Sequence, residues 1–145
     1  MKVAPVFETA DHRWWIVYDQ DEHRVIDSNV YVVESRGEAM ILDPGGFEIF
    51  PQVFAALSEI VAPSKIKAAF VSHQDPDIAS SLPLWNACNP KIQWYIPKLW
   101  EGFIRHYGAL DATFIDIPDE GVFVICCVWR IDRIKAHSGR VCVFT

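Results

Sequence analysis

A histidine and two aspartates occupy alternate positions in the segment VSHQDPDI, residues 71–78. His73, Asp75 and Asp77 follow an apolar run directly, so the pattern predicts a strand that ends at these side chains. Imidazole and carboxylate groups are both acceptable ligands for iron, manganese and zinc. Two neighbouring carboxylates also repel one another, and a divalent cation relieves that repulsion. The segment therefore indicates a metal site.

The same pattern is also typical of a polar turn that leads into a helix. Asp77 would then cap a helix that begins at Ile78, accepting hydrogen bonds from its first backbone N–H groups. Spacing alone slightly favours this capped turn, so the surrounding elements have to decide between the two interpretations.

The elements before this segment are predicted to be strands. Residues 14–18 and 29–34 are rich in β-branched and aromatic side chains, residues 39–42 are apolar, and polar turns separate the three. The third strand stops at DPGG, residues 43–46, because proline lacks a backbone donor and the glycines permit positive φ.

Helical and strand patterns alternate from that point on. Residues 50–61 place apolar side chains along one helix face, and residues 66–71 form a short apolar strand. A second helix is expected over residues 78–88, either kinked at Pro83 or beginning later than Ile78. A strand over residues 92–96 follows.

A third helix is expected over residues 97–107. Leu99, Phe103 and Ile104 are predicted to face the core, and Gly108 is predicted to end the helix.

The order of these elements predicts the fold class. Meandering strands followed by β-α-β-α-β units favour an α/β fold with helices packed on the face of a sheet. The tract ATFIDIPDEG adds one more strand, and strand-like residues continue from there to Thr145. Because no internal repeat or linker interrupts the chain, we expect residues 1–145 to form a single domain.

Composition excludes several classes of protein. The chain has 145 residues, of which 51% are apolar, so it is not disordered. Its net charge is −6 and its basic residues do not cluster, which excludes a nucleic-acid partner. The longest apolar run, residues 121–129, is too short to cross a membrane.

We also expect a cytoplasmic protein. The N-terminal residues lack the pattern of a signal peptide. The cysteines fit neither a zinc knuckle nor a redox pair, so we expect buried thiols in a reducing compartment; they are Cys88, Cys126, Cys127 and Cys142.

The context of the first segment carries a resemblance to a known family. DPGG after a strand, an amphipathic helix and a strand ending in SHQDPDIASSLPLW together resemble the metallo-β-lactamase superfamily. Within it, the likeness is to the flavodiiron branch and its oxygen-binding diiron proteins, and it covers residues 25–121. It implies an αββα sandwich with metals at one edge, between two sheets. We expect an incomplete sandwich here, mainly the first sheet with its helices.

The resemblance also implies roles for individual residues. His73 matches the first histidine of the family motif His-x-Glu-x-Asp-His, Asp75 stands where the family commonly has Glu, and Asp77 matches its Asp. By that resemblance, His73 and Asp75 bind the first iron and Asp77 binds the second. Ile78 stands where many relatives have another histidine, a departure that fits the oxygen-binding branch better than zinc hydrolases. Asp43 is either a second-layer residue beneath the metals or a turn-forming aspartate.

The remaining ligands of the family are less well matched. His137, in the tract AHSG, is the one candidate for the later histidine on the first iron. Nothing after it can supply the bridging aspartate or the last histidine of the family. Residues 122–145 depart from the family pattern.

These observations lead to a first hypothesis and two alternatives. The first is a diiron domain, with two iron ions as cofactor, that binds or reduces O2 or another small diatomic such as NO. Such an oxidoreductase would receive electrons from a separate redox partner. The alternatives are a zinc-dependent hydrolase of the same superfamily, and a metal-free domain that binds a partner or forms a homo-oligomer.

Overall fold

The structure is a computed structural model of the chain. It describes residues 1–19, 29–108, 111–117, 121–124, 130–136 and 139–144, the last three ranges by their backbone.

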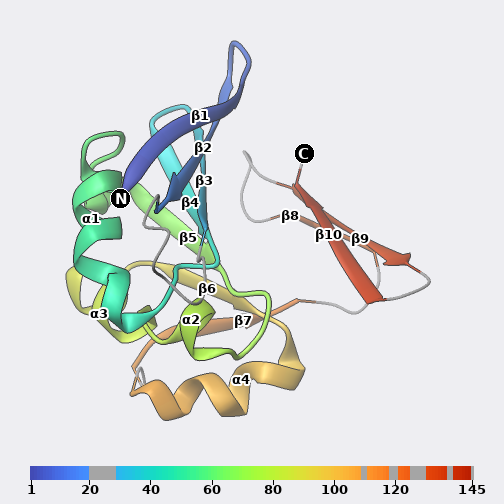
Figure 1. The fold of residues 1–145 in the computed structure, drawn as a ribbon. Coiled ribbons are helices and arrows are strands. Elements are labelled where there is room, and N and C mark those ends of the chain that lie inside the picture. Colours follow the sequence, from blue (N-terminus) through green and yellow to red (C-terminus); the bar gives the residue numbers. More distant parts are fainter. Residues whose placement is uncertain (20–28, 109–110, 118–120, 125–129, 137–138, 145) are drawn as a thin grey trace.

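Seven strands form the larger sheet, and they are arranged in the same order as in the chain (Figure 1). Neighbours from β1 to β4 pair antiparallel, whereas neighbours from β4 to β7 pair parallel. This mixed sheet confirms the predicted meander followed by β-α-β-α-β units. The strands are β1 (Lys2–Glu8), β2 (His12–Tyr18), β3 (Val30–Ser35), β4 (Glu38–Leu42), β5 (Ile66–Phe70), β6 (Gln93–Ile96) and β7 (Thr113–Asp116).

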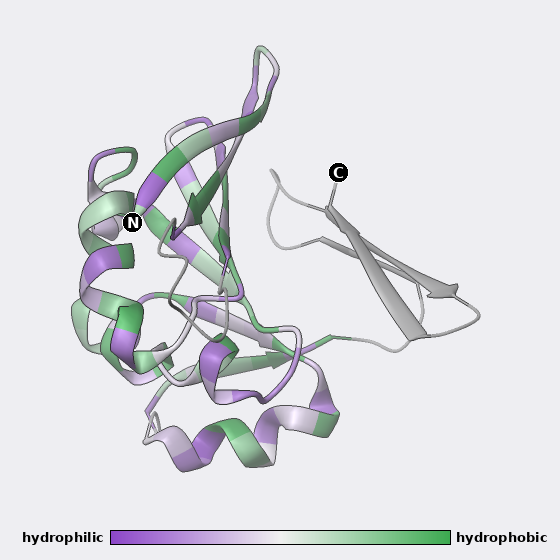
Figure 2. Cartoon of the chain, in the orientation of Figure 1, coloured by the Kyte–Doolittle hydropathy of each residue, from purple (hydrophilic) through white to green (hydrophobic). Residues whose placement is uncertain are grey.

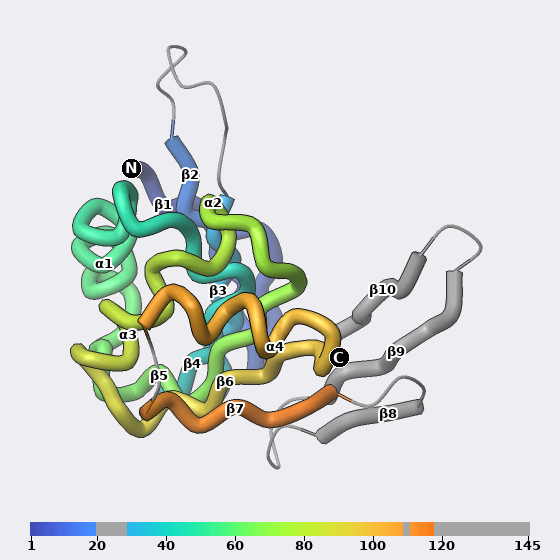
Figure 3. The backbone as a smooth tube through the Cα atoms, turned by 90° about the horizontal axis from the view of Figure 1, so that it is seen from below, coloured from blue at the N-terminus to red at the C-terminus, as the bar shows by residue number. Residues whose placement is uncertain are grey.

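Helices connect the parallel strands, because parallel pairing requires a crossover connection. Figures 1 and 3 show α1 and α3 together on one side of the larger sheet, with α4 near β6 and β7. None of the helices in the described ranges is long and apolar enough to span a membrane. The helices are η1 (Phe47–Ile49), α1 (Phe50–Ser58), η2 (Pro63–Lys65), α2 (Pro76–Ala79), α3 (Leu82–Cys88), α4 (Lys98–Ile104) and η3 (Arg105–Tyr107).

The main core lies between the larger sheet and its helices. Leu57 of α1 and Trp85 of α3 are buried there against strand residues such as Ile41 and Trp94. Alternate residues of the same strands, including Met40 and Phe70, form a second buried cluster. Because successive strand residues point to opposite faces, both faces of this sheet carry apolar side chains. Figure 2 shows how hydrophobic residues recur along these strands and helices.

A smaller antiparallel sheet is formed by the C-terminal strands, in the order β10-β9-β8. The strand-like character expected near the C-terminus is thus confirmed for β8 (Gly121–Val124), β9 (Arg130–Ala136) and β10 (Gly139–Phe144).

The expected helix over residues 78–88 is split into α2 and α3, and Pro83 lies in the first turn of α3. Of the two arrangements that Pro83 allowed, the helix that begins later is therefore confirmed, because proline is tolerated in a first turn and not in a helix interior. The first strand, β1, is not evident from the sequence pattern.

The predicted inner face of α4 is wrong for two of its three residues. Ile104 is buried, but Leu99 and Phe103 are 68% and 57% exposed. Trp100 and Tyr107 pack against the core instead, at the i, i+4, i+7 spacing that Ile104 shares with them. Gly108 ends the segment with φ of 100°, as predicted.

The expectation of buried thiols is also wrong where the structure describes a cysteine side chain. Cys88, at the end of α3, is exposed and free. It lies outside the apolar stripe formed by Leu82 and Trp85, which faces the sheet.

Candidate metal centre

The segment with the histidine and the two aspartates leaves the sheet at the carboxyl end of β5. Hydrogen bonds continue the sheet by one step on each side of this strand, since Asp43 N–H donates to Phe70 O at 2.8 Å and Val71 N–H donates to Tyr95 O at 3.0 Å. The DPGG loop after β4 therefore leaves the sheet beside the candidate ligands. In open α/β sheets, sites form beyond this edge.

The DPGG loop is also bonded to the helices that follow the candidate ligands. Gly45 N–H donates to Ile78 O at 3.0 Å, and Ser81 N–H donates to Gly45 O at 3.2 Å. The Ser81 hydroxyl donates to Pro44 O at 3.1 Å. These hydrogen bonds thus hold together, at the site, two segments that are more than thirty residues apart in sequence.

Asp43 supports the candidate site through Ser72. Its Oδ1 accepts the Ser72 backbone N–H at 2.7 Å, and its Oδ2 accepts the Ser72 hydroxyl at 2.9 Å. Asp43 has a left-handed φ of 52°, which an aspartate tolerates better than most residues. Burial raises the pKa of Asp43 above its ordinary value, although both hydrogen bonds from Ser72 act in the opposite direction.

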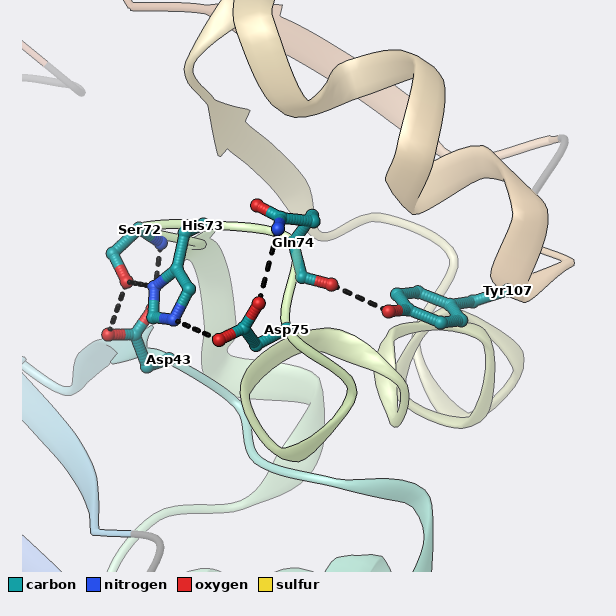
Figure 4. A network of polar contacts seen from close by, with 6 residues as sticks. All are labelled: Asp43, Ser72, His73, Gln74, Asp75 and Tyr107. Atoms are coloured by element: carbon teal, nitrogen blue, oxygen red, sulfur yellow. Dashed lines mark hydrogen bonds and ion pairs between the residues drawn. The ribbon is translucent and has the colours of Figure 1, made fainter.

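The Ser72 hydroxyl in turn sets the orientation of the His73 ring. Ser72 Oγ lies 2.8 Å from His73 Nδ1 (Figure 4). A hydroxyl has a single hydrogen, and that of Ser72 is donated to Asp43. His73 Nδ1 must therefore be the donor to Ser72 Oγ, which leaves Nε2 as the atom available to bind a metal ion.

His73 Nε2 faces the carboxylate of Asp75, with 3.3 Å between Nε2 and Oδ2. When the ring is neutral, with its hydrogen on Nδ1, two acceptor atoms face one another here. Such a pair is stable only with a cation between the two atoms, either a proton on Nε2 or a metal ion.

The spacing of these two atoms suits a metal ion. Donor atoms that each lie about 2.1 Å from one ion are separated by roughly 3.0 to 3.4 Å at octahedral or tetrahedral angles. The observed 3.3 Å falls within this range. The side chains of His73 and Asp75 are 40% and 52% exposed, so an ion could reach them from solvent.

Asp77 lies one step further, in the first turn of α2. Its charge acts on the site, because it contributes to the raised pKa values of Asp43 and Tyr107. Within the ranges that the structure describes, no three His, Cys, Asp or Glu side chains converge on one cation position. The structure thus brings His73 and Asp75 together, while His137 lies outside the described residues.

The capped turn takes a different form from the expected one. The cap position of α2 is Asp75, not Asp77, and its side chain makes no capping hydrogen bond. Asp77 is inside the helix, so it cannot cap it.

Two further residues of the site had no signal in the sequence. Tyr107 donates its hydroxyl to Gln74 O at 2.6 Å, and Gln74 Nε2 donates to Asp75 Oδ1 at 3.1 Å (Figure 4). Tyr107 comes from η3, on the far side of the loop from Asp43.

The fold and the site together define a class of protein. A mixed sheet with helices on one face, and a histidine and carboxylates beyond the end of β5, is the first sheet of a metallo-β-lactamase-like fold. A family profile described as "ODP family beta lactamase" matches residues 26–138. The chain belongs to this family. The match extends beyond residue 121, where the resemblance was expected to end.

Solved structures agree with this assignment. The apo state of chemotaxis sensor ODP from T. denticola is 31% identical, with a TM-score of 0.75 over 94% of this chain and 54% of that chain. The peroxy diiron species of chemotaxis sensor ODP is 30% identical, with a TM-score of 0.73 over 92% of this chain and 53% of that chain. This chain thus spans about half the length of these relatives.

A more distant structure shows the same fold. The flavodiiron protein from Giardia intestinalis is 16% identical, with a TM-score of 0.72 over 90% of this chain and 34% of that chain. None of the curated proteins that were compared with the chain matches it.

Proposed function

We propose that this chain forms part of an oxygen-binding, non-haem diiron domain. The observation that carries the proposal is the 3.3 Å approach of His73 Nε2 to Asp75 Oδ2 at the end of β5. Membership of the ODP family supports it, because one similar structure is described as a diiron species of a chemotaxis sensor.

Three side chains of the loop would hold the metal ions. His73 and Asp75 would bind the first iron, and Asp77 would bind the second. His137 would be a later ligand of the first iron. When bound, a pair of ferrous ions supplies reversible binding and reduction of O2 or another small diatomic such as NO.

The residues around the ligands prepare them for this role. Asp43 and Ser72 keep the His73 hydrogen on Nδ1, so that Nε2 presents its lone pair outward. Such second-layer hydrogen bonds raise metal affinity by fixing the tautomer of the ligand. The Ile78 side chain packs against the main core and offers no metal ligand at this position. A carboxylate-rich set without this histidine favours iron over zinc.

Electrons would come from a separate redox partner in the cytoplasm. If no electrons are delivered, the same centre would bind O2 as a sensor and would not turn over. Whether the chain is an oxidoreductase or a sensor is decided by measuring O2 consumption by the iron-loaded protein with and without a chemical reductant.

Iron analysis of anaerobically purified protein tests the proposal. The folded wild-type chain is expected to retain iron, and the His73→Ala variant is expected to lose at least nine tenths of it. His12→Ala, a histidine on β2 away from the loop, is the matched control and is expected to keep wild-type iron. A folded wild-type protein without bound iron would refute the proposal.

A competition between Fe(II) and Zn(II) separates the iron domain from the zinc hydrolase. We expect Fe(II) to restore O2 binding, and Zn(II) to produce no esterase or lactamase activity. Hydrolysis by the zinc-loaded protein would reverse the assignment.

One observation favours a second candidate, a metal-free binding domain. In the described part of the chain, His73 and Asp75 meet without a third convergent ligand. If the His73→Ala substitution leaves both metal content and stability unchanged, this second candidate is the correct one.

A further inference from the structure

The candidate ligand loop is held from the side opposite to Asp43 by a tyrosine. The Tyr107 hydroxyl donates to the backbone carbonyl of Gln74 at 2.6 Å, and the two residues are 33 positions apart in the chain. The carbonyl belongs to the residue between His73 and Asp75. This contact therefore acts on the backbone at the middle of the candidate ligand pair.

Tyr107 is itself fixed in place by its neighbours. Its ring packs against the main core, so only the hydroxyl end reaches the loop. The neighbouring Arg105 donates to Glu101 at 2.7 Å and lies over the Phe114 ring at 4.3 Å. Gly108 then ends the turn with φ of 100°. A hydroxyl on a ring that packs against the core can set the position of a loop that is otherwise partly exposed.

The side chain of Gln74 contacts Asp75 directly. Its side-chain amide donates to Asp75 Oδ1 at 3.1 Å, while Asp75 Oδ2 faces His73 Nε2 at 3.3 Å. The two carboxylate oxygens thus have different partners. Because the amide holds Oδ1 toward Gln74, Oδ2 is the oxygen that faces an ion beside His73.

We propose that Tyr107 and Gln74 are positioning residues that make Asp75 a one-oxygen ligand. This inference rests on the proposed function, since it concerns the same candidate iron position. Tyr107 fixes the backbone between the two ligands, and Gln74 restrains one carboxylate oxygen. Without the amide, both oxygens of Asp75 become free to chelate the ion, and the coordination number of the ion rises.

Binding of Co²⁺ to the whole 145-residue chain tests the proposal, because the visible spectrum of this ion reports its coordination number. Tyr107→Phe removes one hydroxyl and is expected to weaken Co²⁺ binding about fivefold. Gln74→Leu is expected to weaken binding about tenfold and to lower the visible absorption, as a higher coordination number does. The loss of Co²⁺ affinity in the double variant is expected to be smaller than the product of the two single-variant losses, since both residues act through Asp75.

Tyr95→Phe is the matched control. Its hydroxyl also donates a hydrogen bond, to Gln93 Oε1 at 3.0 Å, and Gln93 lies at the end of β6 away from the loop. The control is expected to keep both the affinity and the Co²⁺ spectrum of the wild type. If Tyr107→Phe and Gln74→Leu match this control in affinity and spectrum, the proposal is overturned.

A metal-free measurement separates this inference from the proposed function. Amide hydrogen exchange of residues 72–79 is expected to be about fivefold faster in Tyr107→Phe than in Tyr95→Phe, because one hydrogen bond to the loop is lost. If the wild type binds no Co²⁺, the proposed function fails, and the exchange rates still decide whether Tyr107 holds the loop. Equal exchange rates in the two variants would overturn the role of Tyr107.

Discussion

His73 Nε2 lies 3.3 Å from Asp75 Oδ2, although the Ser72 hydroxyl has already placed the ring hydrogen of His73 on Nδ1. A cation between the two atoms, either a proton on Nε2 or a metal ion, satisfies this contact. A metal ion would replace that proton, because a ligand imidazole must be neutral. The contact therefore connects metal binding to proton release.

Proton release gives the first prediction. Binding of Zn²⁺ or Fe²⁺ is expected to weaken as the pH is lowered, because protons compete with the metal for Nε2 of His73. Calorimetry at about pH 6, in two buffers with different ionisation heats, measures the number of protons released. We expect up to one proton per ion from this site. The same heat in both buffers would show that Nε2 carries no exchangeable proton.

The link between Asp43 and His73 gives the second prediction. Ser72→Ala removes the hydroxyl that joins them and is expected to reduce metal affinity about tenfold, because the ring loses its fixed tautomer. Ser58→Ala is the control, since the hydroxyl of this exposed serine donates to the Phe54 carbonyl on α1, away from His73. Isothermal titration of both variants is the measurement, and equal affinities would contradict the role of Ser72.

The sequence predicted that His73 and Asp75, the candidate ligands, lie close together, because local spacing and local structure coincide there. His73 and Asp75 are two residues apart at a strand end, and an apolar run is enough to locate that end. The same holds for the parallel half of the sheet, because the apolar residues of each strand and helix recur with the spacing typical of that element.

The supporting contacts could not be predicted, because they join segments that are distant in the chain. Asp43 meets Ser72 across 29 positions, and Tyr107 meets Gln74 across 33. The prediction of which face of α4 is buried was wrong for a related reason. Leu99 and Phe103 form one apolar stripe and Trp100, Ile104 and Tyr107 form another, so tertiary packing decides which stripe is buried.

The ion pairs of Glu101 on α4, with Lys98 and with Arg105 of η3, give a prediction about stability and pH. Hydrogen bonds from Arg105 and then Lys98 lower the pKa of Glu101 below its usual value of 4.5. A lowered pKa in the folded state contributes stability above the unfolded value, and this contribution is lost as the pH falls through the folded value. Glu101→Gln is expected to cost about 0.5 to 1 kcal/mol at pH 7 and progressively less below about pH 4.5.

Urea unfolding at several pH values measures this difference. Glu59→Gln, at an exposed position after α1, serves as the control and is expected to change the free energy of unfolding by less than about 0.5 kcal/mol at every pH. A cost of Glu101→Gln that is the same at pH 7 and at pH 3 would contradict the ion-pair explanation.

Three glycines provide the last prediction, because alanine meets a different environment at each. Gly102 lies inside α4 with open space where an alanine methyl group would lie, and alanine there is expected to stabilise the chain by about 0.5 to 1 kcal/mol. Gly37 also has open space but a φ of 78°, so alanine is expected to cost about 1 kcal/mol.

Gly45 has both a left-handed φ and too little space for a Cβ atom, and it belongs to the loop beside the candidate metal centre. Its φ is 88°, and a Cβ atom there would lie 2.8 Å from Ile49 Cδ1 and 3.3 Å from Val30 Cγ2. Gly45→Ala is expected to cost about 2 to 3 kcal/mol. Because the Gly45 N–H and carbonyl also hold Ile78 and Ser81, the variant is expected to bind metal more weakly as well. Thermal unfolding and metal titration of all three variants test this order, and a Gly45→Ala protein as stable as Gly37→Ala would contradict the close packing of the DPGG loop against Ile49.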